Sequence, residues 1–142
     1  MKAISLAVLA LLLTTGVAVA ADPTGTWRLD NGKVTVKVIQ CGQEVCANIV
    51  ALKEPTYKDG TPKIDKYNKD PSLRSRPLLG LPVLSDMKPS GDNSWAGNIY
   101  NADDGRTYTA TMTLSGTTMK LKGCVAGIFC KTNTFKKLSQ GN

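Results

Sequence analysis

The sequence predicts an all-β protein: an eight-stranded, antiparallel, up-and-down barrel with one long polar connection at residues 53–79. Three observations lead to this prediction. Several segments alternate apolar with polar residues, which places the apolar side chains on one face of a strand. Turn signals separate these segments at short intervals. The chain has 142 residues, which is enough for one domain but not for two independent cores.

The chain begins with the pattern of a secretory signal peptide, which we assign to residues 1–20. Lys2 supplies a positive start, Ala3 begins an apolar run, and Ala18-Val19-Ala20 is a small-residue cleavage signal. A membrane anchor is disfavoured, because it needs about 20 apolar residues. We therefore expect a single barrel domain over residues 21–142, located in the periplasm or secreted.

The first four predicted strands precede residue 88. Asn31-Gly32 is a two-residue hairpin signal. Val34, Val36 and Val38 follow it and share one face of their strand. Residues 88–93 contain a proline and a glycine and predict a loop. The four strands are expected at 25–30, 34–38, 46–52 and 80–87.

The last four predicted strands include the cleanest period of two, at residues 106–114, where apolar side chains alternate with four threonines. Asp103-Asp104-Gly105 and Ser115-Gly116 predict the turns on either side of it. The other three strands are expected at 94–101, 117–123 and 129–138. The side chains expected to face inward are Trp95, Gly97, Ile99, Tyr108, Ala110, Met112, Leu114, Met119 and Leu121.

The interior of an eight-stranded barrel either is filled by side chains or holds one small ligand. Small residues and flexible methionines among the inward positions make an apolar cavity possible, and a packed core is the alternative. Tyr100 and Tyr108 either offer hydroxyls to a ligand or act as ordinary barrel aromatics. The residues expected to contact a ligand are Trp27, Val36, Val38, Arg76, Trp95, Ile99, Tyr108, Met112, Met119 and Leu121.

Four cysteines are expected to form two local disulfides, because paired cysteines are the default in an oxidising compartment. The spacing favours Cys41 with Cys46 and Cys124 with Cys130, each pair across a predicted turn. The alternative of a zinc site is disfavoured, because these spacings fit zinc-binding turns poorly. A redox role is disfavoured by the absence of a Cys-x-x-Cys motif. We predict no metal site and no cofactor.

The long connection carries seven basic and four acidic residues and predicts either a lid over one mouth of the barrel or a loop packed on its side. Asp70-Pro71 resembles a helix N-cap, so we expect a short helical turn at 72–75. Asp65, Asn68 and Arg76 form a candidate polar cluster. In this cluster Arg76 either binds an anionic headgroup or simply pairs with Asp65.

The absence of histidine excludes Ser-His and Cys-His nucleophile pairs and His-ligated metals. No spacing of acidic residues proposes a carboxylate pair for glycoside cleavage. We therefore expect the protein not to be an enzyme. Without Lys2 of the signal peptide the net charge is +6, which permits weak association with an anionic envelope, and nucleic acid is not an expected partner of an exported protein. Nothing in the sequence indicates the oligomeric state.

In chain order the sequence contains Gly25-Thr26-Trp27, Cys41 and Cys46 before Ile49-Val50, Asp65 with Asn68 and Arg76-Pro77-Leu78, Gly80-Leu81-Pro82-Val83-Leu84, Trp95-Ala96-Gly97, and Asp104-Gly105-Arg106-Thr107-Tyr108. Together these motifs resemble the bacterial exported family catalogued as domain of unknown function 2147. This resemblance implies a lipocalin-like barrel that carries a small apolar or amphipathic ligand. It also implies that Trp27 packs beneath a basic side chain that closes one end of the barrel. Members of the family end with Trp-x-Arg, where this chain has Phe135 and Lys137.

These observations predict an exported protein that binds a small apolar or amphipathic molecule in a barrel cavity. The alternative is a periplasmic interaction module, such as a protease inhibitor or an envelope-associated structural protein. A small barrel can present an N-terminal arm to the cleft of a partner, and the arm in this chain is residues 21–26.

Overall fold

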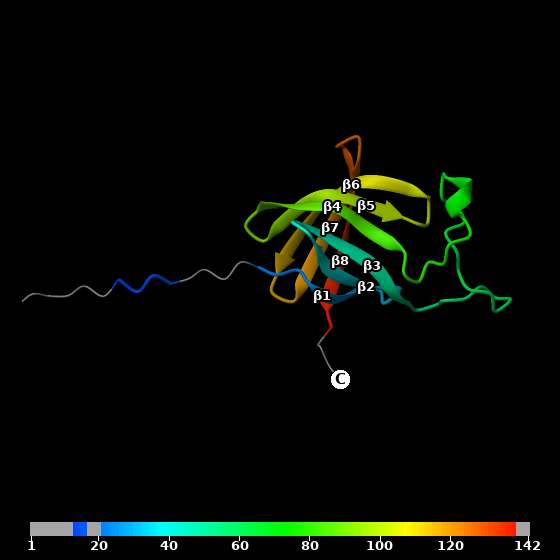
Figure 1. Ribbon diagram of the computed structural model, residues 1–142, viewed down its shortest axis with the longest axis horizontal. Helices are drawn as coiled ribbons and strands as arrows, with labels where there is room; N and C mark the ends of the chain where they lie inside the picture. The colour runs from blue at the N-terminus through cyan, green and yellow to red at the C-terminus, as the bar shows by residue number, and fades with distance from the viewer. Residues whose placement is uncertain (1–12, 17–20, 139–142) are drawn as a thin grey trace, which may run out of the picture.

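Eight antiparallel strands form a closed barrel in the computed structural model, which describes residues 13–16 and 21–138. Each strand pairs with the next, and β8 pairs with β1, as the wrapped ribbon in Figure 1 illustrates. The predicted fold class is confirmed. Apart from residues 13–16, the predicted signal peptide lies outside the described residues. The strands are β1 (Gly25–Leu29), β2 (Val34–Cys41), β3 (Glu44–Leu52), β4 (Pro82–Gly91), β5 (Ser94–Asn101), β6 (Arg106–Ser115), β7 (Thr118–Val125) and β8 (Phe129–Lys137).

The predicted loop at 88–93 is wrong for its first four residues, because β4 continues to Gly91. Lys88 pairs with Ala96, and Pro89 pairs with Trp95. The register shifts between Ser85 and Lys88 and again after Pro89. Such irregularities are where a strand accommodates a proline, which has no N–H to donate. Pro89 and Gly91 therefore mark a distorted part of β4 and not the start of a loop.

The two ends of the barrel differ in the length of their connections. Two-residue turns at 42–43, 92–93 and 116–117 lie at one end, which we call the closed end. The opposite end, which we call the mouth, is formed by residues 30–33, 53–81, 102–105 and 126–128. In Figure 1 the long connection between β3 and β4 extends beyond the barrel at the mouth. No helix in the described part of the chain has the length and apolarity needed to cross a bilayer.

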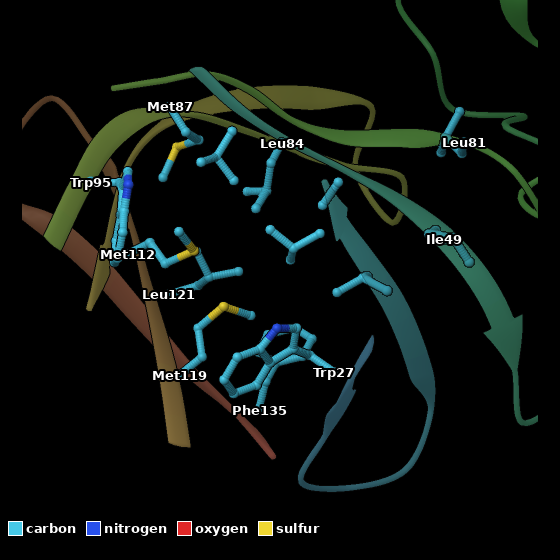
Figure 2. Packing of buried hydrophobic residues seen from close by; sticks show 14 residues of the cluster. Trp27, Ile49, Leu81, Leu84, Met87, Trp95, Met112, Met119, Leu121 and Phe135 are labelled. Carbon is cyan, nitrogen blue, oxygen red and sulfur yellow. The ribbon is translucent and has the colours of Figure 1, made fainter. Parts of the chain in front are cut away.

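The half of the barrel toward the closed end is filled by large apolar side chains. Trp27, Met87, Met112 and Met119 have no exposed surface. In Figure 2 the labelled side chains of Trp27, Met112, Met119 and Trp95 extend from different strands into the same interior. The Trp27 indole N–H donates a hydrogen bond to the Pro23 carbonyl at 2.9 Å, so its buried polar group is satisfied. This half is a packed core.

Both predicted disulfides are present. Cys41 and Cys46 bridge the turn between β2 and β3 at the closed end, with their Cα atoms 5.9 Å apart. Cys124 and Cys130 are directly opposite each other on β7 and β8 at the mouth, with a Cα–Cα distance of 4.1 Å. Two disulfides indicate an oxidising, extracytoplasmic location.

Candidate functional site

A cavity of about 1030 Å³ occupies the half of the barrel toward the mouth. Its volume is at the upper end of the range of about 300 to 1,000 Å³ that is typical of ligand pockets. The interior was predicted to be either hollow or filled, and the structure divides it into one half of each kind. The apolar residues of the cavity wall include Val36, Ile49, Leu84, Ile99, Leu121 and Phe135.

Charged side chains surround the opening of this cavity. Lys33, Lys53, Lys63 and Lys131 are among the lining residues, together with Glu54. The Lys63 ammonium lies 3.6 Å from the Glu54 carboxylate, so these two charges partly compensate. The remaining three lysines face two further carboxylates, Asp103 and Asp104, so the rim carries a small excess of positive charge above an apolar wall. This arrangement is complementary to an amphipathic molecule with an anionic headgroup.

The rim also contains a tyrosine–carboxylate pair. The Tyr108 hydroxyl donates a hydrogen bond to Asp104 in the turn between β5 and β6. This hydrogen bond to a carboxylate raises the pKa of Tyr108 above its ordinary value of 10.0. The hydroxyl therefore stays protonated at neutral pH and holds the turn against β6.

The ten residues predicted to contact a ligand separate into three groups. Val36, Ile99, Tyr108 and Leu121 line the cavity. Arg76 lies outside the lumen, where it lines a groove of about 800 Å³ beside β6 and β7. The other five lie in the packed core instead of the cavity wall, since a period of two gives the face of a strand but not the depth along the barrel. These are Trp27, Val38, Trp95, Met112 and Met119.

Most of the residues that line the cavity were not predicted from the sequence, and two of them show why. Lys131 and Asn133 line the lumen on β8. Both alternate in steps of two with Phe135, which is buried. Counting back from that phenylalanine in steps of two would have identified both residues. Because they are polar, however, the sequence pattern assigns them to the solvent face of the strand.

Asp65, Asn68 and Arg76 come together in the long connection as predicted, and Tyr100 of β5 completes the cluster. The Asp65 carboxylate has no exposed surface. It accepts hydrogen bonds from the Tyr100 hydroxyl at 2.6 Å, the Asn68 amide at 2.8 Å and the Arg76 Nε at 2.9 Å. Arg76 is therefore engaged by Asp65, which is the structural one of the two predicted roles.

The electrostatics of this cluster favour an ionised aspartate. Burial raises the pKa of Asp65, but the hydrogen bonds from Tyr100, Asn68 and Arg76 outweigh burial and bring the pKa below 3.8. Burial also raises the pKa of Tyr100, and the neighbouring carboxylate raises it further. At neutral pH the cluster is thus a buried carboxylate held by one cation and two neutral donors.

The cluster fixes the long connection against the mouth. Tyr100 belongs to the barrel wall, whereas Asp65, Asn68 and Arg76 belong to the connection. At Gly105, in the turn between β5 and β6, an added Cβ would lie 1.8 Å from the Tyr67 carbonyl oxygen, so the connection passes directly against this turn. The helical turn predicted at 72–75 is present, but it begins one residue earlier, as a short 3-10 helix at Pro71–Leu73. The Asp70 carboxylate accepts the Ser72 N–H at 2.9 Å. The connection is an ordered segment attached to one side of the opening.

The residues implied to close the barrel lie together at the closed end. Trp27 and Lys137 are paired across β1 and β8. The Lys137 ammonium is 5.5 Å from the centre of the Trp27 ring, within the range of a cation–π contact. Phe135 is buried beside them and is 6% exposed. In the described residues, no group of three or more Cys, Asp or Glu side chains is placed to share a metal ion.

Comparisons with known proteins agree with this architecture. A family described as uncharacterized protein conserved in bacteria, domain of unknown function 2147 (DUF2147), matches residues 25–137. The chain belongs to this family. No curated protein matches the DUF2147 chain significantly. Its structure is similar to that of protein HP1028 from the human pathogen Helicobacter pylori, described as belonging to the lipocalin family. The TM-score is 0.72 at 25% sequence identity, covering 85% of this chain and 86% of the other.

Proposed function

We propose that this protein is a periplasmic or secreted binding protein that holds an apolar or amphipathic molecule in its barrel. The observation that carries the proposal is the cavity of about 1030 Å³ with an apolar wall and an opening at the mouth. Eight-stranded barrels of this size can enclose one small ligand. The lysines at the rim further favour a molecule whose tail lies against the wall and whose anionic headgroup lies at the opening.

We propose a binding role without catalysis. Three carboxylates line the cavity, those of Glu54, Asp103 and Asp104, and all three are exposed at its rim. Asp104 accepts the Tyr108 hydroxyl, and Glu54 lies beside Lys63. A general base must lie within hydrogen-bond reach of its substrate. The exposed position of these groups, together with the absence of histidine from the chain, supports a binding role over acid–base chemistry.

The N-terminal arm offers little support for the alternative of a protease inhibitor. Pro23 is buried, and its carbonyl accepts the hydrogen bond of the Trp27 indole. An arm held in this way does not extend into the cleft of a partner. A direct test is to extract the purified native protein and identify by mass spectrometry any small molecule that it releases.

The site itself is tested with a matched pair of substitutions. Val36→Phe adds a ring to the cavity wall, where Val36 is 3% exposed, and Val50→Phe makes the same change on the outer face of β3, where Val50 is 46% exposed. The probe is anilinonaphthalene sulfonate, an aromatic anion with an apolar body. We expect Val36→Phe to weaken probe binding by about tenfold or more, because it fills part of the pocket. Val50→Phe should leave it unchanged.

Two results would contradict the proposal. One is equal probe binding by both variants, which would locate the probe on the outer surface. The other is the absence of any releasable small molecule together with no probe binding by the native chain. Unfolding curves of the two variants serve as the control that each remains folded.

A further inference from the structure

The turn between β7 and β8 carries an exposed apolar tip. Ile128 and Phe129 are 77% and 76% exposed, and Val125 is 43% exposed. We call these three residues the apolar tip. In Figure 1 this turn projects away from the body of the barrel. A cluster of exposed apolar side chains marks an interaction site, whereas single exposed apolar side chains are common on protein surfaces.

The backbone holds the apolar tip in a defined conformation. The Ile128 N–H donates to the Val125 carbonyl at 3.2 Å. Ala126 and Gly127 between them both have positive φ, 52° and 68°. Positive φ at both central residues is typical of a type I′ turn, which here lies within the three-residue connection at 126–128. The Cys124–Cys130 disulfide closes the hairpin directly below. The tip is therefore presented by a fixed hairpin at the mouth.

Basic side chains lie on both sides of the tip. The outer groove of about 800 Å³ is bounded by Val125 of the tip and also by Lys69, Arg76 and Arg106. Its lining also includes the carboxylate of Asp70, which is engaged by the Ser72 N–H and hydroxyl. On the cavity side Lys131 follows the tip by two residues. Asp103 and Asp104 also lie on the cavity side, and Arg76 is paired with Asp65. Over the groove and the cavity together, basic side chains still outnumber carboxylates by seven to four.

We propose that the apolar tip docks this protein onto an anionic lipid bilayer. Its side chains enter the headgroup region, and the surrounding basic residues contact lipid phosphates. A bilayer fits better than a folded partner, because three side chains are too few for the roughly 1,000 Å² of a stable protein interface. A second copy is disfavoured by the net charge of +6 on residues 21–142. The docking places the mouth beside the membrane and does not depend on what the cavity holds.

The test is co-sedimentation with vesicles of phosphatidylcholine alone and of phosphatidylcholine mixed with phosphatidylglycerol. We expect binding to the mixed vesicles that weakens with added salt. Ile128→Ser with Phe129→Ser should reduce that binding by about tenfold or more, since two apolar side chains no longer leave water. Ile39→Ser is the matched control, because Ile39 is 41% exposed at the closed end. It should bind as the native protein does.

A second measurement reports the tip directly. Phe129→Trp adds an exposed indole to a chain whose own Trp27 and Trp95 are buried. Its emission should shift to shorter wavelength on mixed vesicles and be quenched by brominated lipid. Val36→Phe should bind vesicles normally, which separates this proposal from the ligand proposal. No binding to mixed vesicles, equal binding to both vesicle types, or binding that survives the double tip substitution would overturn the docking proposal.

Discussion

Removing one hydroxyl from the Asp65 cluster should destabilise the protein strongly and in a pH-dependent way. Tyr100→Phe deletes the group that donates to the buried Asp65 carboxylate at 2.6 Å and accepts from the Asn68 amide at 3.1 Å. Hydrogen bonds to charged groups contribute about 1.5 to 3 kcal/mol, and the carboxylate has no exposed surface through which water could replace the lost donor. We therefore expect a loss of about 2 kcal/mol in the free energy of unfolding at neutral pH.

The sign of the pH dependence follows from the lowered pKa of Asp65. In the folded state the pKa of Asp65 is below the usual value of 3.8. Such a carboxyl group stabilises the folded protein at pH values above 3.8. This contribution is lost as the pH falls through the folded-state pKa. The difference between the native protein and Tyr100→Phe should thus be largest at neutral pH and should narrow in acid.

Guanidinium denaturation from neutral to acidic pH measures the effect of Tyr100→Phe. An unfolding curve with a shifted midpoint and an unchanged slope identifies a pure change in stability. Tyr108→Phe is the matched control, because its hydroxyl donates to Asp104, which is exposed in the turn between β5 and β6. We expect a much smaller loss for it. Equal losses for the two variants, or a Tyr100→Phe loss that does not change with pH, would refute the role assigned to the Asp65 cluster.

The remaining predictions concern the attachment of the connection and the two halves of the barrel. Gly105→Ala should destabilise the protein more than Gly116→Ala, although both have positive φ, because only the first new Cβ meets a neighbour, the Tyr67 carbonyl. Limited proteolysis should cleave the connection faster in that variant, and equal rates would argue against the contact. Met112→Ala should cost about 2 to 5 kcal/mol in denaturant unfolding, as in a packed core. Ile99→Ala, beside the cavity, should cost clearly less; equal costs would indicate a uniformly packed interior.

The strand pattern was predictable because each strand satisfies local rules. In residues 106–115 the alternation of apolar side chains with threonines specifies the buried face without knowledge of any partner strand. Asn31-Gly32 and Ser115-Gly116 likewise fix their turns within a few residues. The error at Pro89 has the opposite origin. β4 continues past Pro89 because a register shift in its pairing with β5 accommodates the proline. The sequence around Pro89 contains no information about this pairing with β5.

The site was only partly predictable, because its decisive contacts join distant parts of the chain. The pairing of Asp65 with Arg76 lies within one connection, so residue chemistry suggested it. Tyr100 is 35 residues from Asp65, and nothing near either residue specifies their hydrogen bond. Depth along the barrel was equally hidden: Met112 and Tyr108 share a face of β6, yet one is in the core and the other lines the cavity.

The division of the barrel explains how stability and an open cavity coexist in a small chain. A cavity removes packing contacts from the residues around it, which lowers stability. Here the loss is confined to the mouth, while Met87, Met112 and Met119 are fully buried in the closed half. At the mouth, local constraints take the place of a core. The Cys124–Cys130 disulfide closes one hairpin there, and Asp65 attaches the long connection to β5. The same constraints keep the apolar tip and the opening in a fixed relation, so that a bilayer contacting one would lie beside the other.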